Sequence, residues 1–539
     1  MSRYIDPEVF PDFFRKAVVR WSAGALSGVL LFVCFPKADW NFLVWIATLP
    51  LTCALVNETR LRRAFGIAYL CGAVFFAGSC YWFVDVIQQY GGLSRGLAWA
   101  ALVLFVIIDS VFFGVFGLVQ SAVARRSLGL GLALNPFLWV TMEVARTYLI
   151  TGFPWNLLGY ALQVAGLKQI ASVTAVYGLS FLAVATSAVL AWVLFRPGRA
   201  AARGALACWV VLLLLGNWLL KPPPETPGSN RACLLQPDVP LDETALESWL
   251  PWVNPSHLDQ LVNMSVTAAE QGEGKSPASS AGTSHPASAP PLIVWAENPA
   301  PFYFATDKDF RSAVERMARQ AHAYVVINTV IPLDPKATRV TNSAIVVDPE
   351  GNEVLRYDKI HLVPFGEYVP AWAFPGDVGT IATSIGSFVP GSSYPVAHTP
   401  EGTIGVFICY EAIFPQLVRR IAAQGAGVLV NISNDAWYGD TAAAFQHFEM
   451  ARFRAIENHR YLLRATNNGI TAIIDPYGRV VKSLPRNERA VLSGRYSYRN
   501  KQTFYTAHGD VFAWGAVMIA AALVVVAALS GRRKATSEG

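Results

Sequence analysis

Three residues in the polar part of the sequence could together break and form an acyl bond, and the first of them is a thiol. Cys409 closes the apolar run G-V-F-I and precedes Y-E and a helix that we expect at 414–423. A thiol held at the tip of a buried strand is rigid and can still be reached, as a nucleophile must be. It attacks as a thiolate, so it needs a base and a positive charge close by.

Two other strand ends offer those groups. Glu297 closes L-I-V-W-A-E and could act as general base and acid. Lys359 closes L-R-Y-D-K, and its ammonium group could favour the thiolate and bind an oxyanion. Each of the three has an ordinary alternative: a core cysteine, a helix cap before Pro299, and a solvated charge at the end of a hairpin. Their joint occurrence favours catalysis.

Histidine partners for the thiol are harder to find. No cysteine–histidine protease signature surrounds the candidate histidines, which are His361, His398, His447 and His459.

The elements that must hold these residues are short apolar runs alternating with helical ones, which is typical of an α/β domain. We expect strands at 232–236, 292–296, 323–330, 343–348, 353–359, 403–408, 428–432, 461–466, 471–475 and 480–484, and helices at 243–269, 309–321, 414–423 and 445–459. The turns P-E-G (349–351) and P-Y-G (476–478) indicate two hairpins. Residues 271–291, rich in Ser, Ala, Gly and Pro, are expected to be a disordered insertion.

The rest of the chain is too apolar for an ordinary soluble protein, with 53% hydrophobic and 15% charged residues. Eight stretches approach the roughly 20 apolar residues that a membrane span needs. They lie near 21–35, 40–56, 64–87, 97–122, 130–150, 170–195, 205–220 and 511–529. The net charge of +6 comes without a long basic run, which argues against nucleic acid as a partner. Seven scattered cysteines without a C-x-x-C pair indicate neither disulfides nor zinc.

Positive charge in the short loops gives the orientation. If the spans alternate, five positive segments fall on one side, and that side is cytoplasmic. They contain Arg15, Lys16 and Arg20; Arg60, Arg62 and Arg63; Arg125 and Arg126; Arg196, Arg199 and Arg203; and Arg532, Arg533 and Lys534. Both termini are then cytoplasmic. The polar segment lies on the other side of the inner membrane, which in a Gram-negative bacterium is the periplasm.

The loop after the fifth expected span is apolar and aromatic but broken by Gly and Pro. Residues 151–162 read T-G-F-P-W-N-L-L-G-Y-A-L and include Trp155. Such a segment is either an interfacial aromatic belt or part of a lipid-binding cleft. Glu143 and Arg146 precede it within the span, either as functional intramembrane charges or as an ion pair.

The motifs resemble those of a known superfamily. Glu, Lys and Cys in this order at strand ends, with K-I-H-L-V-P-F-G-E at 359–367 and G-V-F-I-C-Y-E at 405–411, resemble the nitrilase (carbon–nitrogen hydrolase) superfamily. Together with eight spans and the G-F-P-W-N loop at 152–156, almost the full chain resembles the apolipoprotein N-acyltransferase family. The resemblance implies an α-helical transmembrane bundle of eight spans and an extramembrane α/β domain, a nitrilase-like αββα sandwich. Its domains would be 1–220, 221–507 and 508–539.

The resemblance also implies a reaction. Cys409 would take an acyl chain from a phospholipid, such as the sn-1 chain of phosphatidylethanolamine, as a thioester. The α-amino group of the S-diacylglyceryl-cysteine of an apolipoprotein would then collect that chain. Glu297 would move protons, and Lys359 with the backbone N–H of Tyr410 would bind the oxyanion. Glu367 would orient the lysine, and Glu411 matches a family position beside the nucleophile. The resemblance implies no cofactor or metal, and we expect a monomer.

Residues after the next strand could form the pocket wall or only a turn, and we favour the wall. They are Asn431, Asn434, Asp435 and Trp437. Structural ion pairs are the preferred interpretation of Arg452, Arg454, Glu457 and Arg460, whereas Trp249 and Trp252 are open between lid and surface roles. Two alternatives to acyl transfer are a membrane-tethered amidase acting on a small soluble amide and an inactive scaffold. A lipid substrate requires a pocket that opens toward the bilayer, whereas a small amide does not.

Overall fold

The computed structural model describes residues 12–90, 94–196, 200–240, 255–271, 289–297, 303–336, 338–368 and 388–537. Its contacts divide the chain into two compact units. Residues 1–223 with 508–539 form one of them, which we call the membrane unit, and residues 224–507 form the α/β unit.

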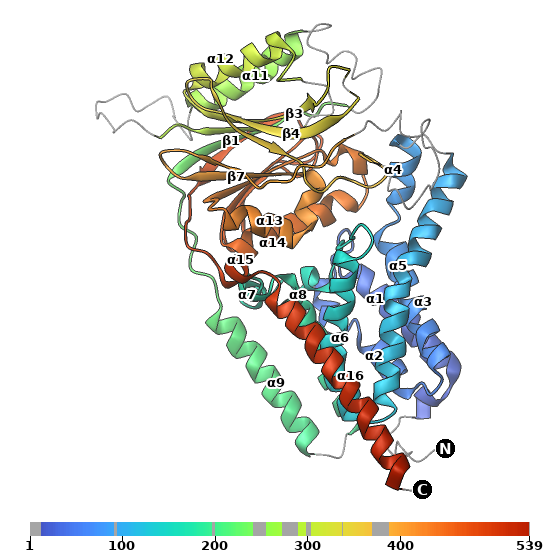
Figure 1. Ribbon diagram of the computed structural model, residues 1–539. Coiled ribbons are helices and arrows are strands. Elements are labelled where there is room, and N and C mark those ends of the chain that lie inside the picture. Colours follow the sequence, from blue (N-terminus) through green and yellow to red (C-terminus); the bar gives the residue numbers. More distant parts are fainter. Residues whose placement is uncertain are drawn as a thin grey trace. The chain divides into compact units, whose positions relative to one another are not determined.

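The membrane unit is helical in its described part (Figure 1). Its helices are α1 (Ala17–Val33), α2 (Leu49–Asn57), α3 (Leu61–Ser79), α4 (Phe83–Tyr90), α5 (Arg95–Ala124), α6 (Leu128–Tyr148), α7 (Ala171–Thr174), α8 (Val176–Phe195), α9 (Ala200–Leu219) and α16 (Val511–Ser537). Within the described ranges, six of them are long and apolar enough to cross a membrane: α3, α5, α6, α8, α9 and α16.

The first three expected spans differ from these helices. The first falls on α1, whose 17 residues measure about 26 Å, less than the roughly 30 Å of bilayer hydrocarbon. The second is broken between Trp45 and Leu49, because Pro50 stands at the start of α2, where its missing N–H is not needed. The third ends early, since α3 stops at Ser79 and α4 begins at Phe83. The count of eight spans therefore remains a prediction.

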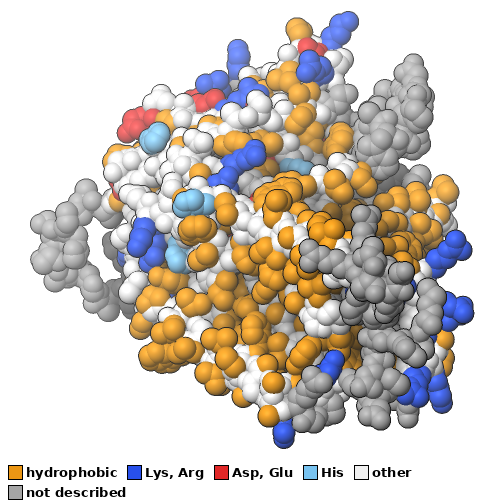
Figure 2. Space-filling model, turned by 60° about the horizontal axis from the view of Figure 1, so that its bottom comes forward, with side chains coloured by type: hydrophobic (Ala, Val, Ile, Leu, Met, Phe, Trp, Pro, Cys, Tyr) orange, Lys and Arg blue, Asp and Glu red, His pale blue; other side chains and the backbone are white. Residues whose placement is uncertain are grey.

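The outer surface of the membrane unit is apolar. Val211, Leu214 and Trp218 of α9 are exposed, as are Val103 and Ile107 of α5. Hydrophobic side chains dominate the middle of the face in Figure 2, where Lys and Arg are few and scattered. This pattern suits helices whose solvent is lipid.

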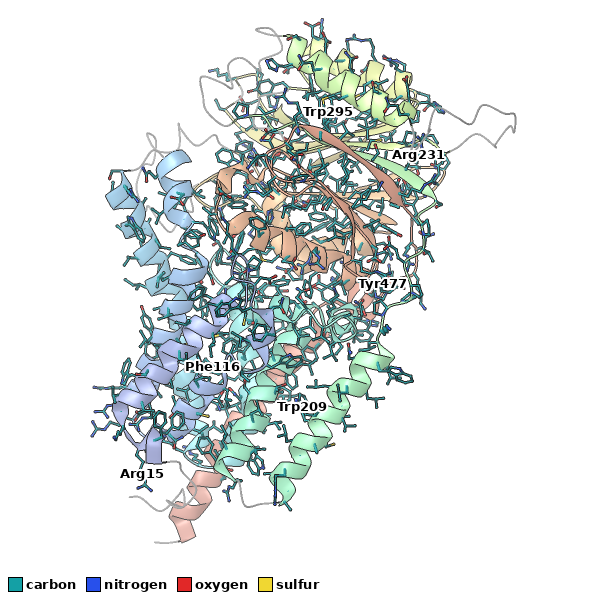
Figure 3. The ribbon with its side chains drawn as sticks, turned by 180° about the vertical axis from the view of Figure 1, so that it is seen from behind. Arg15, Phe116, Trp209, Arg231, Trp295 and Tyr477 are labelled. Carbon is teal, nitrogen blue, oxygen red and sulfur yellow. The ribbon has the colours of Figure 1, made fainter. Side chains whose placement is uncertain are left out.

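Small residues let the membrane helices approach closely. A Cβ atom on Gly117 of α5 would lie 2.4 Å from the Cβ atom of Ala68 and 2.6 Å from the carbonyl oxygen of Ala64, both on α3. No side chain fits there, so α3 and α5 pack backbone against backbone at this point. Phe116, the preceding residue of α5 (labelled in Figure 3), packs edge-on against Trp139 of α6, with ring centroids 5.4 Å apart.

The α/β unit contains two six-stranded sheets among its described residues. The first has the order β12-β1-β2-β3-β4-β5 and the second β11-β10-β9-β8-β7-β6. The strands are β1 (Asn230–Gln236), β2 (Leu292–Trp295), β3 (Tyr324–Pro332), β4 (Val340–Val347), β5 (Glu353–Asp358), β6 (Val396–His398), β7 (Thr403–Ile408), β8 (Val428–Ser433), β9 (Tyr461–Thr466), β10 (Ala472–Ile474), β11 (Val480–Ser483) and β12 (Ala490–Tyr496). The neighbours β1, β2 and β3 run parallel, and so do β7, β8 and β9.

Helices pack against these sheets. Phe310 and Met317 of α12 (Lys308–Ala321) share a buried cluster with Ile293 of β2. Trp295 of β2 donates from its ring nitrogen to Ser265 Oγ of α11 (Pro255–Gln271) at 2.9 Å (Figure 3). On the second sheet, α13 (Pro415–Ala423) packs closely against β7 at Gly405, which has no side chain. A Cβ atom at this position would lie 2.5 Å from Ile421 of α13. Figure 1 shows α13 and α14 (Ala443–Asn458) beside the sheet that contains β7.

Most of the elements expected in the α/β unit are present. All ten expected strands occur with ends shifted by a few residues, and both hairpin turns join antiparallel pairs, β4–β5 and β10–β11. The sequence reasoning missed β6, β12 and the short helix α15 (Phe504–His508). The helix expected at 243–269 is described only as α11, because 241–254 lie outside the described residues. So do Trp249, Trp252 and residues 272–288 of the expected insertion.

Candidate active site

Cys409 lies where β7 ends and a single turn of 3-10 helix (Cys409–Ile413) begins. Its φ angle is +49°, a left-handed conformation that residues other than glycine rarely adopt. Its side chain is buried, with 5% of the residue exposed. A strained backbone is a feature that clusters at functional sites, because the surrounding structure must enforce it.

Glu411 ties this turn to the segment that carries the lysine. Its Oε2 accepts from the Ile408 N–H at 2.7 Å, and its Oε1 accepts from the Ile360 N–H at 2.7 Å. Oε1 also accepts from the Tyr357 hydroxyl at 2.8 Å and from the His361 N–H at 3.1 Å. Burial raises the pKa of the Glu411 carboxyl to about 7 against the lowering effect of these donors and of the Lys359 charge.

Lys359 follows β5 and lies between two carboxylates. Its Nζ is 2.8 Å from Glu367 Oε1 and 3.6 Å from Glu297 Oε1, and 1% of its side chain is exposed. Glu297 Oε2 accepts from the backbone N–H of Asn434 at 3.0 Å. Glu367 Oε2 accepts from the Val363 N–H at 2.8 Å, which fixes the carboxylate that holds the lysine.

Asn342 completes this arrangement and was not predicted. Its Nδ2 donates to Glu297 Oε1 at 2.9 Å and to Glu367 Oε1 at 3.0 Å, while its own Oδ1 accepts from Asn328 at 2.8 Å. Its strand reads V-T-N-S-A-I-V-V, and Asn342 is one of three adjacent polar residues there, so the local pattern does not single it out. Asn342 therefore positions both carboxylates relative to Lys359.

The electrostatics of the site favour a protonated thiol at rest. Burial raises the pKa of Cys409 above its usual range, and the Glu297 carboxylate raises it further. The Lys359 charge and a hydrogen bond with Ser433 oppose this but do not reverse it. Burial alone would lower the pKa of Lys359, yet the Glu367 and Glu297 carboxylates outweigh it and raise that pKa, so the lysine stays charged. A thiol that is protonated at rest could attack only with the help of a base, and Glu297 is close enough for its charge to act on Cys409.

The residues expected in the pocket wall have different places. Asn434 meets Glu297 through its backbone. Asp435 is fully buried and pairs with Arg464 at 2.8 Å, and Asn431 also accepts from Arg464, so these two belong to a buried network. Trp437 is 40% exposed.

The residues expected to form ion pairs belong to α14 and the turn after it. Arg454 pairs with Glu457 at 2.8 Å, and Arg452 pairs with Glu449 at 2.6 Å. Arg460 binds backbone carbonyl oxygens instead, including that of Ala426 at 2.6 Å.

Trp155 lies in the membrane unit and is buried among aromatic rings. Its ring stacks on Phe153 with centroids 6.0 Å apart and contacts Trp82 at 4.8 Å. Arg146 Nη2 donates to the Trp155 carbonyl oxygen at 2.8 Å, and Glu143 Oε1 accepts from the Leu158 N–H at 2.8 Å. The two charged residues of α6 thus bind the backbone of the loop at 151–162, Arg146 within G-F-P-W-N and Glu143 just after it.

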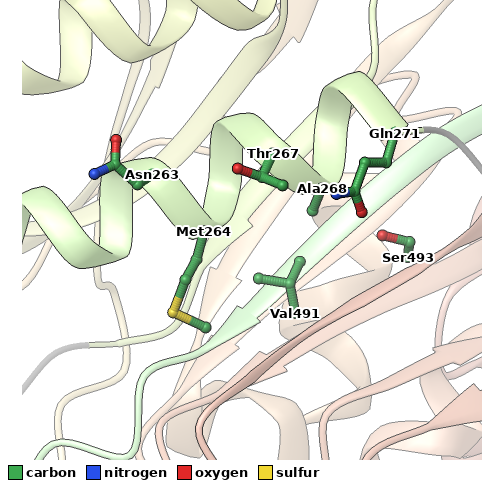
Figure 4. A pocket seen from close by; sticks show the side chains of 7 residues that line it. All are labelled: Asn263, Met264, Thr267, Ala268, Gln271, Val491 and Ser493. Carbon is green, nitrogen blue, oxygen red and sulfur yellow. The ribbon is translucent and has the colours of Figure 1, made fainter.

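A surface pocket of about 480 Å³ lies elsewhere in the α/β unit, between α11 and β12 (Figure 4). None of the predicted site residues lines it. Its walls are Asn263, Met264, Thr267, Ala268, Gln271, Val491 and Ser493.

Two family models match the chain. Residues 285–497 match the carbon-nitrogen hydrolase model, and residues 27–189 match the model of the apolipoprotein N-acyltransferase N-terminal domain. The two sheets with a buried Glu, Lys and Cys in one unit therefore belong to a carbon–nitrogen hydrolase domain, here joined to an apolar helical unit.

Full-length relatives narrow this class. An apolipoprotein N-acyltransferase of Geobacter metallireducens is 35% identical over 97% of this chain and 98% of its own length. One from Methylococcus capsulatus is 32% identical over 90% of this chain and 92% of its own. Among solved structures, an amidase from Nesterenkonia sp. is similar at 20% identity and a TM-score of 0.35, over 53% of this chain and 94% of that one. By its full-length relatives, the chain belongs to the apolipoprotein N-acyltransferase family.

Proposed function

We propose that this protein transfers an acyl chain from a phospholipid to the α-amino group of the S-diacylglyceryl-cysteine of an apolipoprotein, through a thioester on Cys409. The observation that supports this most directly is the thiol on a strained strand end, coupled to the Glu297–Lys359 pair at 3.6 Å, in a chain with a large apolar helical unit. Membership of the family supplies the class of substrates.

In the first half-reaction the Cys409 sulfur attacks the ester carbonyl carbon of the phospholipid. Glu297 takes the thiol proton, and a C–S bond forms as the carbonyl becomes a tetrahedral oxyanion. Lys359 and the backbone N–H of Tyr410 stabilise that oxyanion. When the ester C–O bond breaks, Glu297 gives the proton to the leaving alkoxide, and a lysophospholipid departs from the acyl-enzyme.

In the second half-reaction the amine of the apolipoprotein attacks the thioester. Glu297 removes one proton from the attacking nitrogen, the same oxyanion site serves again, and the C–S bond breaks. The thiolate recovers a proton from Glu297, which restores the resting enzyme and leaves an amide on the lipoprotein.

The remaining expectations about architecture belong to the same proposal. The protein crosses a bacterial inner membrane eight times, counting the shorter helices, with both termini in the cytoplasm and the α/β unit in the periplasm. The two sheets and the helices that cover them form an αββα sandwich. The protein acts as a monomer, and Trp155, Asn434 and Trp437 contact substrate.

Intact mass spectrometry after incubation with phosphatidylethanolamine tests the reaction and the nucleophile together. The native chain should gain the mass of one acyl chain, removable by hydroxylamine, and Cys409→Ala should gain none. Cys233→Ala is the matched control, because Cys233 is also a buried thiol of the α/β unit, with 2% of the residue exposed. An adduct on Cys409→Ala, or none on the native chain, would refute the proposal. Release of ammonia from small amides, without any acyl adduct from lipid, would favour the amidase alternative.

A further inference from the structure

A buried histidine reaches the peptide of the nucleophile itself. His447, on α14, has its Nε2 3.1 Å from the carbonyl oxygen of Cys409, and its side chain is fully buried. A carbonyl oxygen can only accept a hydrogen bond, so His447 donates to Cys409 in the tautomer that carries the proton on Nε2. The sequence offered this residue as one of four candidate histidines without a signature.

The other ring nitrogen is fixed by a buried ion pair. His447 Nδ1 lies 3.0 Å from Asp435 Oδ1 and 3.2 Å from Arg464 Nη2, and Arg464 Nη2 donates to Asp435 Oδ2 at 2.8 Å. Burial and the Arg464 charge lower the pKa of His447, which keeps the ring neutral. Two acceptors compete for the single proton of the neutral ring, Asp435 Oδ1 at Nδ1 and the Cys409 carbonyl oxygen at Nε2. Arg464 Nη2 is a donor within 3.2 Å of Nδ1, so it can satisfy an unprotonated Nδ1 and permits the tautomer that donates from Nε2 to Cys409.

The bond from His447 acts on a residue with a left-handed backbone conformation. Cys409 holds its φ of +49° only if the structure on both sides enforces it. Glu411 accepts from the Ile408 N–H at 2.7 Å on the side that precedes the nucleophile. His447 holds the carbonyl on the side that follows, in the same peptide group that carries the Tyr410 N–H.

We propose that His447 is a positioning residue for the nucleophile. By donating from Nε2 to the Cys409 carbonyl, it keeps this peptide in the left-handed turn that directs the sulfur at the acyl carbon and the Tyr410 N–H at the oxyanion. The inference rests on the proposed function, because it takes Cys409 as the nucleophile. The His447 side chain is fully buried and acts on the reaction only through Cys409.

The expected effect is on rate and not on substrate affinity. A displacement of about 1 Å in a reacting group can slow a reaction about 100-fold. Loss of the Nε2 donor should therefore slow thioester formation while the KM for phospholipid stays the same, because no substrate contact is removed.

Two substitutions separate the donor from the ring. The amide nitrogen of glutamine in His447→Gln can take the place of Nε2, whereas the shorter asparagine in His447→Asn reaches only about as far as Nδ1. Both lose the ring contact with Tyr438, whose centroid lies 5.7 Å away, so both should melt at similar temperatures. We expect His447→Gln to form the Cys409 thioester within about tenfold of the native rate and His447→Asn to be about 100-fold slower.

Thioester formation is followed by intact mass spectrometry on full-length protein with phosphatidylethanolamine. Equal rates in the two variants, or rates that simply follow melting temperature, would overturn the inference. A native chain without any acyl adduct would instead refute the proposed function. Failure of the His447 inference and failure of the proposed function can therefore be told apart. If neither variant folds, the ¹⁵N spectrum of the histidine ring in native protein decides, and a proton found on Nδ1 and not on Nε2 would rule the inference out.

Discussion

At the scale of single residues, the site contains one positive and two negative side chains around a thiol that burial keeps protonated. Lys359 is flanked by Glu297 and Glu367, and the charges of Lys359 and Glu297 act on Cys409 in opposite directions. In the proposed mechanism, the same carboxylate that makes the thiol harder to ionise takes its proton. Removal of the Glu297 carboxylate should therefore affect the alkylation of Cys409 by a small electrophile and the transfer of an acyl chain in different ways.

Glu297→Gln should separate these two reactivities. Removing the negative charge lowers the pKa of Cys409, so more thiolate exists at pH 7 and alkylation of Cys409 by iodoacetamide should become several-fold faster, up to about tenfold for one unit of pKa. Lys359→Met removes the positive charge and should slow alkylation by a similar factor. Acyl transfer should fall at least about 100-fold in both, because a proton carrier or an oxyanion donor is lost.

Peptide-level mass spectrometry measures this, because it distinguishes Cys409 from Cys208, which is exposed. Alkylation slowed equally by both substitutions would contradict the assigned charges. It would show that Glu297 contributes to alkylation mainly as a base.

Asp435 gives a prediction about acid stability. The Arg464 and His447 partners hold the pKa of the Asp435 carboxyl below its usual range although burial acts to raise it. A group with a lowered folded-state pKa stabilises the fold above its unfolded pKa of about 4, and this stability disappears as the pH falls through the folded value. Asp435→Asn should lower stability by about 3–5 kcal/mol at pH 7, because it leaves Arg464 buried and unpaired.

The difference in melting temperature between native and variant, measured in detergent, should be largest at pH 7 and should shrink below about pH 4. Asp440→Asn is the matched control, since its side chain is 86% exposed in its pair with Arg486, and exposed pairs contribute little. A difference that stays constant down to pH 3 would show that Asp435 stabilises the fold by packing and not by charge.

Residues of the candidate site could be proposed from the sequence where they follow an expected strand, as Glu297, Lys359 and Cys409 do, and the structure places Glu297 and Lys359 3.6 Å apart. Residues that only hold other residues of the site in place, through hydrogen bonds, could not be predicted. Asn342 lies in a strand and His447 in a helix, and neither interrupts a pattern that would mark it. Both act through tertiary contacts with residues more than 35 positions away, at 2.9 Å to Glu297 and 3.1 Å to Cys409, and local sequence carries no record of such pairs.

At the scale of elements, the close approach of α3 and α5 depends on a glycine. Gly117→Ala would place a Cβ atom 2.4 Å from Ala68 and 2.6 Å from a backbone oxygen, so the helices must separate. We expect a loss of about 1–3 kcal/mol, seen as a lower melting temperature in detergent. Gly96→Ala is the control in the same helix, because nothing lies within 4 Å of its added Cβ. Equal effects of the two substitutions would show that helix propensity and not packing decides.

The elements that the sequence did not reveal share a physical reason. β6 has only three residues, too few for a recognisable apolar run. β12 reads A-V-L-S-G-R-Y, and its Ser and Gly break the alternation of a strand. It exists because it pairs antiparallel with β1, from Asn230 opposite Tyr496 to Gln236 opposite Ala490. A run of apolar residues predicts a strand that is buried inside its sheet. An edge strand such as β12 lacks such a run, and it forms because it pairs with a strand that lies far away in the sequence.

At the scale of the whole molecule, the proposed reaction needs the α/β unit on the periplasmic side of the membrane. Cysteines introduced near the two ends of α9 can test this orientation. Glu225 follows α9 in the linker and Arg203 lies in its first turn, and both are exposed. About 30 Å of helix separates the ends of a 20-residue span. In spheroplasts, Glu225→Cys should react with a membrane-impermeant maleimide, whereas Arg203→Cys should react only after lysis. The native chain controls for Cys208, which lies within α9. The reverse pattern would place the α/β unit in the cytoplasm, and labelling of both in intact spheroplasts would show that α9 does not span the bilayer.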